Sequence, residues 1–101
     1  MLKVPNASEI FFVCTEGLVT SVTGAEALKL ELVAAELPDV SVRHIQTSWL
    51  PKDAQIVLCH KTTVGFVQGL VPEAVVIGVT DFLKAPEYKE LAEALKEARG
   101  L

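Results

Sequence analysis

The sequence is poor in several features that would each point to a particular class of protein. It has two cysteines in 101 residues, too few for a disulfide-rich secreted domain. Their spacing with the two histidines matches no zinc finger or ribbon, so we expect no metal. Nine basic residues against thirteen acidic ones give a net charge of -4 without a Lys/Arg cluster. We therefore expect no nucleic-acid partner.

Long hydrophobic segments are missing as well. Apolar runs such as Ile10 to Cys14 and Ala74 to Gly78 are far shorter than the roughly 20 residues that cross a bilayer. The opening stretch, MLKVPNASEI, has no continuous apolar core of a secretory signal. We expect a cytoplasmic protein without direct membrane insertion, and the length fits one domain over residues 1–101.

The apolar pattern predicts four strands and three helices. Nearly continuous apolar runs indicate strands covered on both faces, whereas a β-rich run that carries Arg43, His44 and Gln46 suits an edge strand. The strands are expected at Glu9 to Cys14, Val40 to Thr47, Ala54 to Cys59 and Ala74 to Thr80. The first helix is expected at Val22 to Leu37, where Pro38-Asp39 ends it. The second is expected between His60 and Pro72, and the third from Pro86 to a stop near Gly100.

The order β-α-β-β-α-β-α predicts an α/β fold, a Rossmann-like three-layer sandwich with a four-stranded parallel sheet. The SWLPKD connection is short for a crossover, so we place the second strand at the edge and predict the strand order 2-1-3-4. In such sheets ligands bind beyond the carboxyl ends of the strands, where the strand order reverses. That point is the end of the first strand, at Cys14, next to the strand that ends at Cys59 and His60.

The loop after Cys14, CTEGLVTS, has the properties of an anion site. Gly17 permits backbone conformations closed to other residues, Thr20 and Ser21 supply hydroxyls, and the amides of a helix start can converge on one anion. The positive end of the helix dipole also favours a thiolate. Cys14 is therefore the candidate nucleophile of a covalent phosphoryl-transfer site.

Other interpretations of these side chains remain open. A single cysteine at the end of a buried strand is more often a core residue than a nucleophile, and Cys14 with Cys59 could also form a redox pair. For Cys59 a structural role comes before a catalytic one, and for His60 the structural and accessory roles are balanced. His44 is expected as a surface or packing residue, and Trp49 is expected as a core plug or turn anchor.

Missing motifs narrow the chemistry further. No GxGxxG follows the first strand, and the loop has no GK[ST], which argues against dinucleotide binding and nucleotide hydrolysis. Phosphatases with a C-x5-R loop need arginine six positions after the cysteine, where this chain has Thr20. Without that guanidinium we expect neither efficient phosphatase nor arsenate reductase activity.

Three segments carry a resemblance to a known family. CTEGLVTS at Cys14 to Ser21 is similar to the active loop of galactitol-type IIB components of the sugar phosphotransferase system (PTS). DAQIVLCHK at Asp53 to Lys61 and VIGVTDFL at Val76 to Leu83 resemble segments of the mannitol type. The likeness covers nearly the whole chain in length and element order.

This resemblance implies a phosphotransferase with a phosphocysteine intermediate, of the protein-N-phosphohistidine-sugar type. A IIA phosphohistidine donor would phosphorylate Cys14, and Cys14 would pass the phosphoryl group to a sugar bound by a membrane IIC partner. His60 is a possible accessory residue, and no metal or cofactor is implied. The implied phosphate-binding loop consists of Thr15, Glu16, Gly17, Leu18, Val19, Thr20 and Ser21.

Two loop residues depart from the family pattern. Glu16 puts a carboxylate into a loop meant for a dianion, and Val19 replaces a residue that is usually small. Either Glu16 points outward, toward a partner, or the loop has lost phosphate affinity. The second case supports the alternative function, a non-catalytic IIB-like binding or regulatory module that has lost efficient phosphotransfer.

Overall fold

The computed structural model describes residues 4–14, 19–80 and 86–100, which follow the predicted order of strands and helices. Two short 3₁₀ turns, η1 and η2, follow the second and third strands. The elements are β1 Glu9–Cys14, α1 Val19–Ala34, β2 Ser41–Gln46, η1 Thr47–Trp49, β3 Ile56–His60, η2 Lys61–Thr63, α2 Val64–Leu70, β4 Val75–Val79 and α3 Pro86–Ala98.

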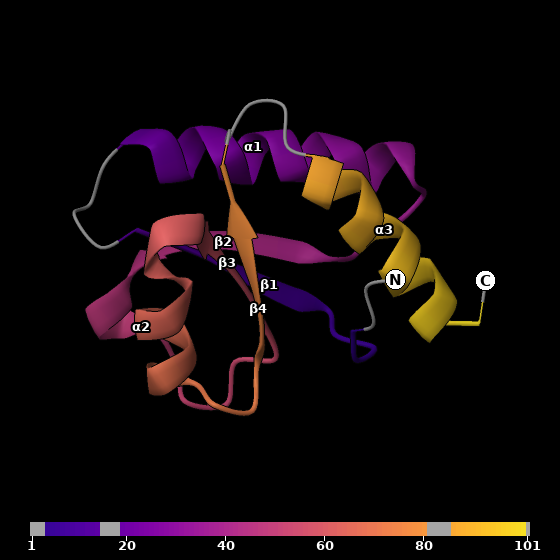
Figure 1. The fold of residues 1–101 in the computed structure, drawn as a ribbon. Helices are drawn as coiled ribbons and strands as arrows, with labels where there is room; N and C mark the ends of the chain where they lie inside the picture. Colours follow the sequence, from indigo (N-terminus) through magenta and orange to yellow (C-terminus); the bar gives the residue numbers. More distant parts are fainter. Residues whose placement is uncertain (1–3, 15–18, 81–85, 101) are drawn as a thin grey trace.

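The four strands form one parallel sheet in the order β2-β1-β3-β4. The predicted fold class and strand order are thereby confirmed, with β2 at the edge. Figure 1 shows α1 and α3 on one face of this sheet and α2 on the other. Each face therefore has a hydrophobic core of its own.

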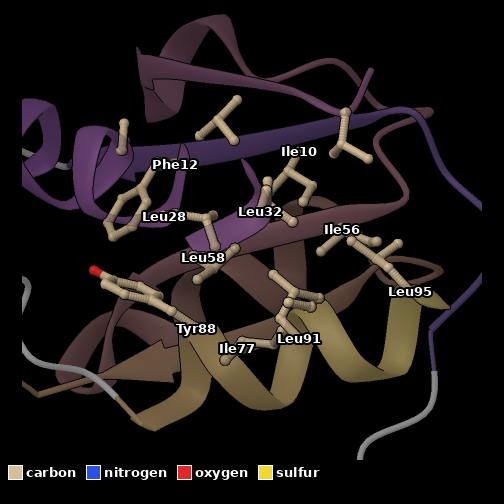
Figure 2. Packing of buried hydrophobic residues seen from close by; sticks show 14 of the residues in the cluster. Ile10, Phe12, Leu28, Leu32, Ile56, Leu58, Ile77, Tyr88, Leu91 and Leu95 are labelled. Atoms are coloured by element: carbon tan, nitrogen blue, oxygen red, sulfur yellow. The ribbon is translucent and has the colours of Figure 1, made fainter. Parts of the chain in front are cut away.

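The larger core lies between the sheet and the helices α1 and α3 (Figure 2). Phe12 of β1 and Tyr88 of α3 meet edge to face, with ring centroids 6.1 Å apart. Gly24 of α1 faces this pair, because a Cβ built on Gly24 would lie 2.6 Å from Cζ of Phe12. The missing side chain is what allows α1 to pack closely against β1. The largest fully buried side chains of this core are Ile10, Phe12, Leu28, Leu32, Leu37, Ile56, Leu58, Leu91 and Leu95.

The smaller core lies on the α2 side of the sheet, and the Gln68 side chain of α2 binds the turn that follows this helix. The core contains Phe11, Val13, Val57, Cys59, Val67 and Val71. The side-chain amide of Gln68 donates to the carbonyls of Val71 and Ala74, each at 3.1 Å, and to that of Pro72 at 3.4 Å. This amide supplies hydrogen bonds to carbonyl groups of the turn that joins α2 to β4.

The helix boundaries differ from the prediction at α1. It begins at Val19 rather than Val22, because three residues interpreted as loop form its first turn. It ends at Ala34, well before Pro38, in a Schellman motif. Glu36 has a positive φ of 63°, and the Leu37 N–H bonds to the Leu32 carbonyl at 2.8 Å. The predicted start of α3 at Pro86 and stop near Gly100, where φ is 77°, are confirmed.

Of the two roles predicted for Trp49, the core plug is wrong and the turn anchor stays a prediction. Trp49 lies in η1 and is 75% exposed. The neighbouring Leu50 packs against the α2-side core instead. Because η1 follows an edge strand, one side of this turn faces solvent, and that side carries the indole.

The end of α3 is tied to the segment before β2. Arg99 donates from Nη1 to both carboxylate oxygens of Asp39, at 2.9 and 2.8 Å. Ahead of β1, the Ala7 N–H bonds to the Pro5 carbonyl at 2.8 Å. Both segments therefore lie at the amino ends of the strands, opposite the edge where Cys14 and His60 end their strands.

Candidate functional site

The carboxyl edge of the sheet brings the predicted residues together. Cys14 is the last residue of β1, where it pairs with Gln46 of β2. His60 is the last residue of β3, where it pairs with Val79 of β4. β1 and β3 pair directly, with Phe12 opposite Leu58, and continuing that register brings His60 level with Cys14. The two segments thus meet where the strand order reverses, as the sequence predicts.

The start of α1 lies close to Cys14 in the chain. Val19, Thr20 and Ser21 form its first turn, and this turn has no acidic residue. The first N–H groups of a helix have no intrahelical partners, and the dipole adds about half a positive charge there. Thr15, Glu16, Gly17 and Leu18 lie outside the described residues. The described backbone thus places a helix N-terminus after the candidate nucleophile, at the same edge of the sheet.

His60 is held by the two threonines of η2. The Thr62 N–H donates to Nδ1 of His60 at 3.2 Å, and Oγ1 of Thr62 lies 2.8 Å from the same nitrogen. Oγ1 of Thr63 donates to the His60 carbonyl at 2.9 Å. The imidazole therefore caps the start of η2. Both its ring and its backbone are fixed at the end of β3.

Cys59 is a free, fully buried thiol in the α2-side core. Burial raises the pKa of Cys59, and a hydrogen bond to Thr63 opposes that rise only in part. A neutral thiol is a poor nucleophile. These features fit the structural role that the sequence favours for Cys59. The Cys14/Cys59 redox pair stays a prediction.

The remaining candidate features lie elsewhere or are not found. His44 is exposed on the edge strand, as predicted. Across residues 4–14, 19–80 and 86–100, no group of three or more His, Cys, Asp or Glu side chains could hold a metal ion. Within those same ranges, none of the helices has the length and apolar character needed to cross a membrane. A hollow of about 310 Å³ between α1 and β2 is lined partly by Leu37, Pro38 and Val40, which places it at the amino end of β2.

Two residues at this edge escaped the sequence analysis. Thr62 was not singled out, because its contact with His60 through a backbone N–H leaves no signal in the sequence. Gly78 of β4 lies under η2, because a Cβ there would be 3.0 Å from the Lys61 Cα. No sequence pattern reveals such a close approach between β4 and η2.

Comparison with known proteins gives two findings. A family model described as "PTS system, Lactose/Cellobiose specific IIB subunit" matches residues 9–94. The chain is also similar to the PTS system mannitol-specific EIICB component of Bacillus subtilis (strain 168), with 38% identity over 95% of this chain and 20% of that protein. The corresponding component of Staphylococcus haemolyticus (strain JCSC1435) is 35% identical over 91% of this chain and 18% of that protein. The chain spans about a fifth of the length of these curated relatives.

Proposed function

Since the chain belongs to the family of PTS lactose/cellobiose-specific IIB subunits, we propose that it is a phosphoryl carrier that works through Cys14. A IIA protein donates the phosphoryl group from a phosphohistidine. Cys14 then passes it to a sugar bound by a membrane IIC partner. The observation that carries this proposal is the position of Cys14, at the end of β1 and shortly before the start of α1.

The proposed reaction consists of two displacements at phosphorus. In the first, the sulfur of Cys14 attacks, an S–P bond forms and the N–P bond of the phosphohistidine breaks. The thiol proton balances the proton that the departing imidazole takes up. In the second, a sugar hydroxyl attacks, an O–P bond forms and the S–P bond breaks, so that the hydroxyl proton is released and a thiolate is left. Positioning and electrostatics supply most of the catalysis in such transfers.

The described residues support an anion at this position. The first turn of α1 carries no carboxylate, so nothing in that turn offsets the positive end of the helix dipole. The same field favours the thiolate of Cys14 as nucleophile and as leaving group. The loop Thr15 to Ser21 is proposed to bind the phosphoryl oxygens through its amides and hydroxyls.

The names of the relatives suggest the partner. They are mannitol-specific components designated EIICB, in which the IIC and IIB designations share one protein. We therefore propose a IIC partner of the mannitol class for this chain.

A transfer experiment tests the assignment of Cys14. The purified chain is incubated with a IIA protein phosphorylated on histidine, and its intact mass is measured. The wild type and Cys59→Ala should each gain one labile phosphoryl group, whereas Cys14→Ala should gain none. Transfer to Cys14→Ala, or no transfer to the wild type from a panel of such donors, would refute the proposal.

Glu16 favours a second candidate function, that of a IIB-like module which binds a partner without efficient phosphotransfer. A carboxylate in the loop would repel the phosphoryl dianion. In that case the wild type should accept little phosphate, Glu16→Gln should accept more, and Cys14→Ala should keep its affinity for the partner. Equal phosphorylation of the wild type and Glu16→Gln would argue against this module.

A further inference from the structure

The contacts of Thr62 determine which nitrogen of His60 carries the proton. The Thr62 N–H can only donate a hydrogen bond, and it points at Nδ1 of His60 from 3.2 Å. Nδ1 must therefore offer a lone pair, and in the neutral imidazole the proton is then on Nε2. Oγ1 of Thr62, at 2.8 Å, can donate to the same lone pair. The N–H contact therefore selects the Nε2–H tautomer, and the hydroxyl contact is compatible with it.

The surrounding backbone keeps this arrangement in place. The Thr63 hydroxyl binds the His60 carbonyl at 2.9 Å, and His60 pairs with Val79 of β4 through the sheet. Below η2, the absence of a side chain at Gly78 leaves room for Lys61. The ring is therefore attached to the end of β3 and to a 3₁₀ turn whose backbone lies close to Gly78, and its contacts with Thr62 orient it.

This arrangement lies beside the proposed phosphorylation site. β1 and β3 are neighbours in the sheet, and Cys14 and His60 are the last residues of these two strands. We infer that Thr62 is a positioning residue that holds His60 as the Nε2–H tautomer, so that His60 can donate a hydrogen bond to the phosphoryl group on Cys14. This inference rests on the proposed function of Cys14 and adds the residues that orient its phosphoryl group.

A neutral N–H donor suits this reaction. Fixed donors aimed at oxygens on which charge develops stabilise the transition state without reorganisation. The donor keeps its proton throughout, so the two displacements at phosphorus stay balanced. In the Nδ1–H tautomer, Nε2 would carry a lone pair and repel the phosphoryl oxygens. The tautomer therefore decides whether His60 helps or hinders the transfer.

Nuclear magnetic resonance tests the tautomer without any phosphoryl donor. The ¹⁵N shifts of the His60 ring are measured in the full chain at a pH where imidazole is neutral, since protonated and unprotonated ring nitrogens resonate far apart. The exposed His44 is the internal reference. We expect His60 to be the Nε2–H tautomer, and Thr62→Pro, which removes the N–H donor, to raise the Nδ1–H population. Thr63→Val, which loses a hydroxyl of the same turn without touching the ring, should leave the tautomer unchanged.

Transfer rates from a phosphorylated IIA donor test the consequence. Thr62→Pro should slow phosphorylation of Cys14 by about 3- to 10-fold, the equivalent of one hydrogen bond, and by more than Thr63→Val does. His60→Ala should slow it by about 10²-fold, as the loss of a donor to a transition-state oxygen does. His60→Gln should retain more activity than His60→Ala, because its amide can still donate a hydrogen bond.

The outcomes separate this inference from the proposed function. An Nδ1–H tautomer in the wild type would overturn the inference, even if Cys14 is phosphorylated normally. Equal rates for Thr62→Pro and Thr63→Val would overturn the positioning role of Thr62. Absence of Cys14 phosphorylation in every variant would overturn the proposed function, and with it the role of His60. The inference is supported only when the tautomer and the rate change together in Thr62→Pro.

Discussion

Replacing Gly78 by alanine should push η2 away from β4. The new Cβ would lie 2.7 Å from Cγ2 of Val64 and 3.0 Å from the Cα of Lys61. Ordinary contacts between carbon atoms are about 3.5–4.0 Å, so the first contact is too short by roughly 0.8 Å. The Lys61 Cα is backbone, and relieving this contact therefore requires η2 itself to move.

The expected effect on stability follows from these distances. Overpacking costs about 1–3 kcal/mol, whereas removing a glycine stabilises the folded state by about 0.4–1 kcal/mol through the unfolded chain. The net change for Gly78→Ala should be a loss of about 1–2 kcal/mol. Urea unfolding would show it as a lower midpoint with an unchanged m-value. The ¹⁵N shifts of His60 should change as well, because Thr62 belongs to the displaced turn.

Gly65 provides the matched control. A Cβ on Gly65 of α2 has no neighbour within 4 Å, so Gly65→Ala should stabilise the protein by up to about 1 kcal/mol through helix propensity. Replacing glycine by alanine should therefore lower the free energy of unfolding at position 78 and raise it at position 65. A Gly78→Ala protein as stable as Gly65→Ala, with unchanged His60 signals, would refute the reasoning about η2.

Three further substitutions have defined outcomes. Glu36→Gly should raise the free energy of unfolding by about 1 kcal/mol, because glycine adopts a positive φ without strain; a lower urea midpoint would contradict the Schellman assignment. Gly24→Ala should lower the midpoint, since its Cβ would meet the Phe12 ring, and the near-ultraviolet circular dichroism of Tyr88 should change with it; a stabilised protein would show that α1 can shift freely. Burial raises the pKa of Cys59, so the unfolded chain loses the thiol proton at a lower pH than the folded chain does. The contribution of this thiol to stability is therefore full below the ordinary thiol pKa of about 8.5 and is lost as the pH rises above that value. Cys59→Ala should lack this component of the alkaline decline, and identical pH profiles would exclude it.

Strand positions and sheet order could be predicted because they depend on patterns that the sequence displays directly. Glu9 to Cys14 is a continuous β-prone run, and the structure has β1 at these residues. The short connection after the second strand indicated an edge position, and β2 occupies the edge. The juxtaposition of Cys14 with Cys59 and His60 at the carboxyl edge follows from these two facts alone.

Other features depend on particular contacts that leave no periodic signal. The core plug expected at Trp49 was wrong because Leu50, one residue later, packs against the α2-side core instead, where it is partly buried. The early end of α1 depends on a glutamate with positive φ, a conformation for which glycine is the usual signal. The tautomer of His60 depends on a backbone N–H two residues away. Hydrophobic patterning does not encode such contacts.

The hydrogen bonds from Arg99 to Asp39 have a practical consequence for where molecules can be attached to the chain. They fix the end of α3 beside the segment that precedes β2, and Pro5 and Ala7 lie ahead of β1 on the same side. Figure 1 accordingly shows the N and C labels on the side of the molecule away from the carboxyl ends of β1 and β3. A tether, fluorophore or fused domain attached at either end would point away from Cys14, so the chain can be immobilised by both ends while a protein donor approaches its other side.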